Sequence, residues 1–303
     1  MKTWIAVTIT LIFWSSAFAG IREGLIGGYS PGHLVLIRFL SASLVFILYA
    51  LWPKSKIHLP KKKDILPILV LGWIGISIYH ISLTFGEETV EAGTASLIIA
   101  AAPAFTALIA TFVLKERLRP IGWVGILIGF LGIALITFGT SGSFGISKNA
   151  LLVLLSAVAT AVFFVYEKPL FKKYNAIELT AFFTWAGTLP MLIFLPGLVH
   201  QMHTATLEST LSGIYIGVCP AAIAYVAWAI ALSSGQASTI TSTLYINPVL
   251  AIFIAWIWLG ELPTFLSIFG GVVAIFGVVI VKVWGSGSGK RKAQVERNTQ
   301  VAG

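Results

Sequence analysis

The sequence predicts an all-α membrane protein whose ten transmembrane helices form two inverted repeats of five helices each. Three observations lead to this fold class. Hydrophobic residues make up 57% of the 303 residues, charged residues only 10%, and the mean hydropathy is +0.94, whereas soluble domains carry about 25% charged residues. Apolar stretches long enough to cross a bilayer follow one another along the whole chain. One long stretch also occurs twice, which indicates an internal duplication.

The duplicated stretch is residues 92–132, which align without a gap with a second stretch 145 positions later. The matching residues are those that punctuate helices, since Pro103 falls on Pro248 and Glu116 falls on Glu261. Apolar residues of membrane proteins align with one another easily, but two prolines and two glutamates in one register do not. We therefore interpret the chain as two copies of one unit.

The duplication predicts the domain organisation. Residues 1–142 form the first repeat and residues 146–284 form the second. Residues 285–303 are rich in Gly, Ser and Lys and have no apolar pattern, so we predict a disordered cytoplasmic tail.

Each predicted helix contains about 20 mostly apolar residues, which matches a hydrocarbon core about 30 Å thick. The helices lie at about residues 3–20, 33–52, 65–85, 92–114, 120–139, 149–166, 178–199, 209–232, 237–259 and 264–284. The first helix also resembles a signal peptide, because Ala17-Phe18-Ala19 could form a cleavage site. The shift of 145 positions aligns this first helix with an internal helix, which cannot be removed by cleavage. We therefore predict that the first helix is retained.

The Lys and Arg residues predict the orientation, because cytoplasmic loops of membrane proteins carry an excess of them. With the N-terminus inside, all of the 20 Lys and Arg residues except Arg22, Arg38 and Lys148 lie at the cytoplasmic side. We therefore predict a multi-pass protein of the inner or plasma membrane with both termini in the cytoplasm. The net charge of +9 is then a topology signal, which excludes nucleic acid as a partner. Because five helices is an odd number, the second repeat must be inverted.

Two inverted repeats can exchange conformations, so that one side of the membrane closes while the other opens around a site at the midplane. The sequence therefore predicts a transporter that works by alternating access.

Three motifs carry a family resemblance. They are Phe13-Trp14-Ser15-Ser16-Ala17-Phe18 in the first helix, Leu-Lys-Glu-Arg-Leu at the end of the Pro103 helix and Leu-Gly-Glu at the end of the Pro248 helix. They resemble the drug/metabolite transporter superfamily, and more narrowly a tandem pair of EamA-type domains, over about residues 3–284. The resemblance implies a ten-helix carrier, in most members an exporter of amino acids, other metabolites or drugs. It also implies a central cavity lined by the first, third, fourth, sixth, eighth and ninth helices.

A polar stripe on the ninth predicted helix gives the first candidate substrate-binding residues. Its members fall at i, i+3, i+4 and i+7 and share one helix face. They are Ser238, Thr241, Ser242 and Tyr245. A cavity lining is favoured over a lipid-facing position, although hydroxyl groups can also bond to their own backbone. In the first copy only Ser96 of the equivalent residues is a polar side chain, so we expect a lopsided cavity.

Further candidates lie on the first, third and sixth helices. Tyr79 and His80 occupy the outer third of the third helix, where an ionisable side chain indicates a site or a neutral histidine bonded between helices. Trp14, Phe18 and Tyr166 present aromatic faces, for which core packing is the alternative. Two residues near helix ends have simpler interpretations. Arg38 is expected to extend towards the membrane surface, and Glu178 is expected to stabilise a helix N-terminus.

The duplicated prolines and glutamates are candidate hinge and gate residues. Pro103 and Pro248 each remove one backbone hydrogen bond within a predicted helix, which can create a hinge or a static bend. Glu116 and Glu261 end their helices in mirrored places and are expected to pair with loop donors. A further repeated feature is a face of small residues on the fifth and tenth helices, which allows close helix packing within one chain or between two, so a monomer and a homodimer both remain open.

Several absences narrow the function. No acidic residue lies near the middle of a predicted helix, which disfavours exchange of organic cations for protons. The single cysteine, the lack of a P-loop and the lack of a nucleophile or metal cluster predict no cofactor, no metal and no enzyme activity. We therefore predict export of a small polar metabolite, an amino acid or a relative, either facilitated or coupled to a proton. The alternatives are a drug or lipid-linked sugar exporter, an intramembrane lipid-modifying enzyme, and a receptor or scaffold without transport.

Overall fold

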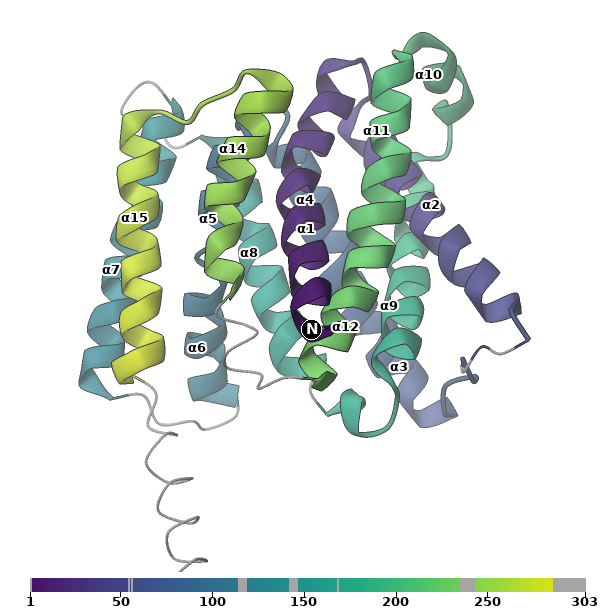
Figure 1. Ribbon diagram of the computed structural model, residues 1–303, viewed down its shortest axis with the longest axis horizontal. Helices are drawn as coiled ribbons and strands as arrows, with labels where there is room; N and C mark the ends of the chain where they lie inside the picture. Colours follow the sequence, from purple (N-terminus) through teal and green to yellow (C-terminus); the bar gives the residue numbers. More distant parts are fainter. Residues whose placement is uncertain are drawn as a thin grey trace, which may run out of the picture.

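The structure is a computed structural model that describes residues 2–53, 55, 57–113, 119–141, 147–167, 169–234 and 243–285, and all regular structure in these residues is helical. The helices run side by side between two ends of the molecule (Figure 1). In chain order they are α1 Lys2–Ile26, α2 Pro31–Leu51, α3 Lys62–Gly72, η1 Trp73–Ile78, α4 Tyr79–Gly86, α5 Ala92–Ile99, α6 Ala102–Val113, α7 Pro120–Ser141, α8 Lys148–Glu167, η2 Leu170–Lys172, α9 Ala176–Met191, η3 Leu192–Phe194, α10 Leu198–Thr204, α11 Leu207–Val218, η4 Cys219–Ile223, α12 Ala224–Ser234, η5 Thr243–Ile246, α14 Asn247–Leu259, α15 Phe265–Ile280 and η6 Val281–Gly285.

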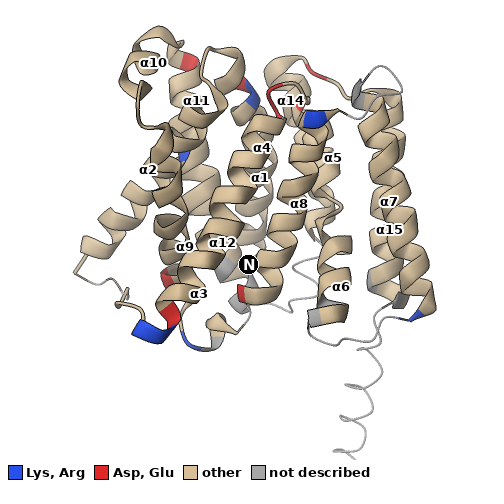
Figure 2. Cartoon of the chain, turned by 180° about the vertical axis from the view of Figure 1, so that it is seen from behind, with Lys and Arg blue, Asp and Glu red and all other residues tan. Residues whose placement is uncertain are grey.

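The helices confirm a multi-pass all-α membrane protein. In the described part of the chain, eight helical stretches are long and apolar enough to cross a membrane, and they coincide with the first eight predicted spans. The last two predicted spans correspond to shorter apolar helices, Thr243–Leu259 and Phe265–Ile280. Lys, Arg, Asp and Glu gather near the two ends of the helices (Figure 2), while large apolar side chains cover the outer surface between them.

Two membrane helices contain a π-helical turn at matching places. The turn η1 joins α3 to α4, and η4 joins α11 to α12. A shift of 145 residues places Ile78, the end of η1, on Ile223, the end of η4. In η4, Pro220 has no backbone N–H group to continue the α-helical pattern. Such turns are frequent at functional sites, and η1 directly precedes Tyr79 and His80.

The predicted proline kink is a complete interruption of the helix. α5 ends at Ile99 and α6 begins at Ala102, with Pro103 in its first turn. Pro248 likewise lies in the first turn of α14, after the 3₁₀ turn η5. Proline is tolerated in the first turn because the N–H group there has no helical partner. In the first repeat the helix therefore stops and restarts at the proline instead of bending through it.

The repeated small residues form one seam between α7 and α15. A Cβ atom added at Gly125 would lie 2.8 Å from the carbonyl oxygen of Gly277, and one added at Gly270 would lie 2.8 Å from that of Gly132. These backbones therefore touch, as small residues in membrane helices allow. The packing partner that the sequence left open is a helix of the same chain.

Other contacts between the two halves also occur in related pairs. A Cβ atom at Gly72 would meet the carbonyl oxygen of Phe183, and one at Gly217 would meet the carbonyl oxygen of Arg38. The 145-residue shift places Gly72 on Gly217 and Arg38 on Phe183, so the second contact is the first one with the two repeats exchanged. The contacts of the α7–α15 seam are related in the same way, and we call these pairs the exchange-related contacts.

One hydrogen bond joins a residue to its own counterpart in the other repeat. The hydroxyl groups of Ser43 on α2 and Thr188 on α9 are 2.9 Å apart and are separated by 145 residues in the sequence. Both side chains are buried. Exchanging the two repeats therefore maps this contact onto itself.

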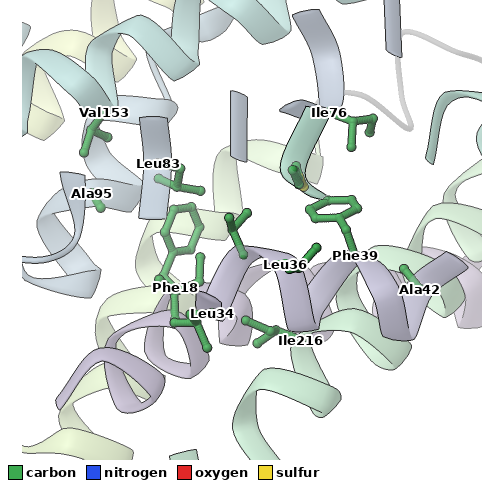
Figure 3. Close-up of a cluster of buried hydrophobic side chains, with 14 of the residues drawn as sticks. Phe18, Leu34, Leu36, Phe39, Ala42, Ile76, Leu83, Ala95, Val153 and Ile216 are labelled. Atoms are coloured by element: carbon green, nitrogen blue, oxygen red, sulfur yellow. The ribbon is translucent and has the colours of Figure 1, made fainter. Parts of the chain in front are cut away.

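The largest group of buried apolar side chains extends over most of the helices, among them α1, α2, α3, α4, α5, α8, α9, α11 and α14, and Figure 3 shows part of it. Phe18 and Leu34 pack together there with Leu83. Phe39 lies farther along α2, facing the π-helical turn around Ile76. The helices that surround the charged residues described below are thus fixed by close apolar packing.

Candidate substrate site in the membrane core

Arg38 is buried between the helices, so the expectation that it extends towards the membrane surface is wrong. Leu34, Arg38 and Ala42 fall at i, i+4 and i+8 on the inward face of α2, and Arg38 is only 3% exposed. Its guanidinium carbon lies 5.5 Å from the ring centroid of Phe39, a cation–π contact. Among the described residues, no hydrogen-bond acceptor reaches Nε or Nη1 of Arg38.

Glu87 is a buried acid that the sequence argument missed. It is the first residue after α4 and lies outside the predicted helix at about residues 65–85, yet it is 0% exposed. No donor in the described part of the chain reaches either carboxylate oxygen. Burial raises the pKa of the Glu87 carboxyl well above its usual range, and Arg38 and Arg22 partly oppose this shift. The carboxyl therefore stays protonated to a higher pH than that of an exposed glutamate.

His80 shares a helix face with Glu87, and its ring packs against Phe39, the neighbour of Arg38. His80, Thr84 and Glu87 fall at i, i+4 and i+7 and share one face of the helix. The His80 ring lies between Phe39, at a centroid distance of 4.6 Å, and Tyr79, at 4.3 Å. In the described structure, neither ring nitrogen of His80 nor the Thr84 hydroxyl has a hydrogen-bond partner. The alternative of a histidine bonded between helices is therefore not what these residues show.

We call Arg38, His80, Thr84 and Glu87 the core polar cluster. α2 packs against α4, and Arg38 lies within electrostatic range of Glu87. Unpaired buried charges are costly, because the protein must replace the lost hydration. The core polar cluster is therefore a candidate binding site, because its residues are buried and have hydrogen-bonding atoms without partners among the described residues. The i, i+4, i+7 spacing from His80 to Glu87 was the sequence signal that could have located it.

A second group of polar contacts lies next to Glu87, at the end of the helices that the sequence predicts to be the outer one. Nε of Arg22 on α1 donates to Oε1 of Glu261 at 2.8 Å, and the backbone N–H of Ala92 donates to Oε2 at 3.3 Å. Nη1 of Arg22 also donates to the carbonyl oxygens of Glu87, at 2.9 Å, and of Glu88, at 2.8 Å. We call these contacts the outer lock, because they tie α1, the end of α4, the start of α5 and the loop after α14 together.

Local backbone geometry positions Glu261 in the lock. Gly260 has a φ angle of +71° and ends α14 in the left-handed conformation that glycine favours. The chain then turns so that the Glu261 carboxylate faces the N-terminus of α5, where a negative charge is stabilised. The sequence predicted that Glu261 pairs with loop donors, whereas the donors in the structure, Arg22 and Ala92, belong to α1 and to the first turn of α5. Its counterpart Glu116 lies outside the described residues.

The aromatic candidates occupy different environments. Nε1 of Trp14 donates to the carbonyl oxygen of Pro220 at 3.2 Å, and the Trp14 ring lies 5.3 Å from that of Tyr225. Phe18 is buried in the apolar core (Figure 3). Tyr166, near the end of α8, is 47% exposed. Trp14 is linked to the core polar cluster through Tyr225, which is in electrostatic range of Arg38.

The hydroxyl candidates are only partly described. Ser96 is buried on α5 and donates to the carbonyl oxygen of Gly93 at 2.6 Å. Tyr245 is half-buried in η5. Ser238, Thr241 and Ser242 lie outside the described residues. Tyr79 and His80 are therefore the predicted candidates that the structure brings together with Arg38 and Glu87.

A groove of about 470 Å³ lies between α1, α11 and α14 and is lined by Glu23, Tyr215 and Trp258, among others, but by none of the predicted candidates. Glu178 caps α9 as expected, because its side chain accepts from the backbone N–H of Asn175 at 3.0 Å. Among the described residues, no group of three or more His, Cys, Asp or Glu side chains is arranged to hold a metal ion.

Comparisons with known proteins agree with a membrane carrier. The model of the EamA-like transporter family matches residues 1–138 and 147–283. The chain is 44% identical over 275 residues to the uncharacterized transporter YdfC of Bacillus subtilis, covering 90% of this chain and 89% of that protein. It is 36% identical over 276 residues to a "Probable terminal-alkyne amino-acid exporter" of Streptantibioticus cattleyicolor, covering 91% and 92%. A solved structure titled "Crystal structure of protein" matches with a TM-score of 0.62 at 20% identity, covering 92% of this chain and 95% of that one.

Proposed function

Because the chain belongs to the EamA-like transporter family, we propose that it exports an amino acid or a related small polar metabolite across the plasma membrane by alternating access. The observation that carries this proposal is the position of the outer lock directly beside the buried core polar cluster. Arg22 holds the backbone of Glu87 in the lock, while the side chain of Glu87 belongs to the cluster. A closed outer side and a buried site are what one of the two alternating states requires.

The exchange-related contacts support the inverted repeat that alternating access needs. When a two-fold axis relates two repeats, each contact between them occurs twice, and the second contact joins the equivalent residues with the repeats exchanged. The pairs Gly72–Phe183 and Gly217–Arg38 have this relation, and the Ser43–Thr188 bond would lie on the axis. We propose that residues 1–142 and 146–284 are the two repeats, with both termini in the cytoplasm.

The relative that is described as an amino-acid exporter supports the substrate class. Buried charges with free hydrogen-bonding atoms suit a small polar solute better than a lipid-linked sugar or an apolar drug. We assign no catalytic role to any residue. His80 and Glu87 are the groups of the cluster that a coupled proton would occupy, in a carrier that works as a monomer or a homodimer.

Counterflow in proteoliposomes tests the proposed function. The purified protein is reconstituted, the vesicles are loaded with one unlabelled solute at a time, and uptake of the labelled form is measured. The panel holds the proteinogenic L-amino acids, a terminal-alkyne amino acid and other metabolites, with and without a pH gradient. We expect exchange of at least one amino acid, and a response to the gradient identifies proton coupling. Absence of exchange for every solute under every gradient contradicts the transporter assignment.

A further inference from the structure

A basic and an acidic side chain of the core polar cluster have polar atoms without hydrogen-bond partners in the described part of the chain. Arg38 offers the hydrogen-bond donors Nε and Nη1, and Glu87 offers both carboxylate oxygens. The Phe39 ring links them, because it lies 5.5 Å from the guanidinium carbon of Arg38 and 4.6 Å from the ring of His80, which shares a helix face with Glu87. Nevertheless, the ion pairs of the described residues do not join them. A ligand that carries one negative and one positive group can therefore satisfy both.

We propose that this pair is a zwitterion site, in which Arg38 binds the carboxylate of an α-amino acid and Glu87 binds its ammonium group. This inference rests on the proposed function and specifies the chemistry of its substrate. A planar guanidinium matches a carboxylate, and hydrogen bonds between charged groups are about twice as strong as neutral ones. An ammonium group beside Glu87 also stabilises the ionised form of a carboxyl that burial otherwise disfavours.

The residues around the pair suit the rest of an amino acid. His80 and Thr84 supply polar atoms without partners among the described residues, on the same helix face as Glu87. Phe39 and Tyr79 enclose the His80 ring and form an aromatic wall. These groups suit the solute side chain, while the two charges fix the orientation of its backbone end.

Only the first repeat carries this arrangement. The 145-residue shift places Arg38 on Phe183, His80 on Tyr225 and Glu87 on Leu232. A symmetrical structural requirement, such as helix packing, would call for equivalent residues in both copies. The charges therefore belong to a single binding site and not to the framework that the repeats share.

The position of Glu87 also connects the zwitterion site to the outer lock. Its carbonyl oxygen accepts from Arg22 at 2.9 Å, while its side chain faces the cluster. An ammonium group that draws the Glu87 carboxylate inwards would act on the backbone that Arg22 holds. Binding and closure of the outer side are then coupled through one residue.

The test measures binding to the purified full-length protein, first with a radiolabelled mixture of the proteinogenic L-amino acids, with the bound species identified by mass spectrometry. The best-bound amino acid is then compared with its methyl ester, which lacks the carboxylate, and with its 2-hydroxy acid, which lacks the ammonium group. We expect each analogue to bind the wild-type protein at least about 100-fold more weakly, because sites built for a polar group reject ligands without it.

Variants assign each charge to its partner. Arg38→Gln should lose the preference for the amino acid over the methyl ester, and Glu87→Gln should lose the preference over the 2-hydroxy acid. Arg38→Lys retains the positive charge and should keep part of the first preference, which covers the case in which Arg38→Gln does not fold. Arg119→Gln, at an exposed arginine, is the matched control and should bind like the wild type.

The possible failures are distinguishable. If solutes exchange in counterflow but the ester and the hydroxy acid bind as tightly as the amino acid, the zwitterion site is wrong while the transporter stands. The same conclusion holds if folded Arg38 and Glu87 variants keep both preferences. If no solute exchanges at all, both proposals are overturned.

Discussion

Replacing Glu261 with alanine is expected to open the outer side of the protein. The change removes the acceptor of Arg22 Nε and of the Ala92 N–H group. Both side chains of the ion pair are mostly buried, at 19% and 16% exposure, so solvent screens the pair only partly. Hydrogen bonds to charged groups contribute about 1.5–3 kcal/mol. The ratio of outward-open to outward-closed protein should therefore rise about tenfold or more.

Labelling of a buried cysteine measures this opening. Val90 lies just after the lock and is 1% exposed, so Val90→Cys in a Cys219→Ser background reports access from outside. We expect Glu261→Ala to raise its labelling rate about tenfold. Glu208→Gln, a neutralisation near the start of α11, serves as the control and should leave the rate unchanged. An unchanged rate in the Glu261 variant would assign the ion pair to static packing.

Substitution of Gly217 with alanine is expected to impair folding and solute binding together. The added Cβ atom would overlap the carbonyl oxygen of Arg38 and lie 2.7 Å from Cβ of Ser41. α11 and α2 must then separate, and overpacking of this kind costs about 1–3 kcal/mol. Because α2 carries Arg38, its displacement also misplaces the guanidinium group.

Gly72, the counterpart of Gly217 in the first repeat, separates the effect on folding from the effect on solute binding. Gly72→Ala places a Cβ atom 2.7 Å from Cβ of Ala186 and 2.9 Å from the carbonyl oxygen of Phe183. We expect a similar loss of thermal stability in detergent but a smaller loss of binding, because Phe183 occupies the place of Arg38. Gly129→Ala, with its nearest contact at 3.8 Å, is the control for both. Equal losses of binding in the Gly72 and Gly217 variants would contradict a one-sided site.

The features that the sequence predicted correctly follow from sequence patterns that only one local structure can satisfy. Long apolar stretches must form helices in a bilayer, since every backbone polar group needs a partner. The repeated small residues predicted close packing of α7 and of α15, because only backbones without large side chains approach so closely, but they did not predict that these two helices pair with each other. Glu178 was placed correctly because a helix N-terminus imposes a local requirement.

The features that the sequence missed depend on tertiary packing. Arg38 could reach water only if its face of α2 pointed outwards, and hydropathy does not report the direction of a helix face. Glu87 follows the last helical residue of α4, and counting by spans excluded it. Its backbone is held by Arg22, which comes from a distant part of the chain. The π-helical turns likewise have no signal in a mean hydropathy.

Cysteine labelling at two equivalent positions tests the central claim, that the two repeats cross the membrane in opposite directions. Lys62 begins α3 and Leu207, its counterpart at the 145-residue shift, begins α11. Both are exposed, and each is replaced by cysteine in a Cys219→Ser background. An impermeant thiol reagent should label the Leu207 variant in intact cells and the Lys62 variant only after the membrane is permeabilised. Labelling of both from the same side would contradict the inverted repeat and the alternating access that depends on it.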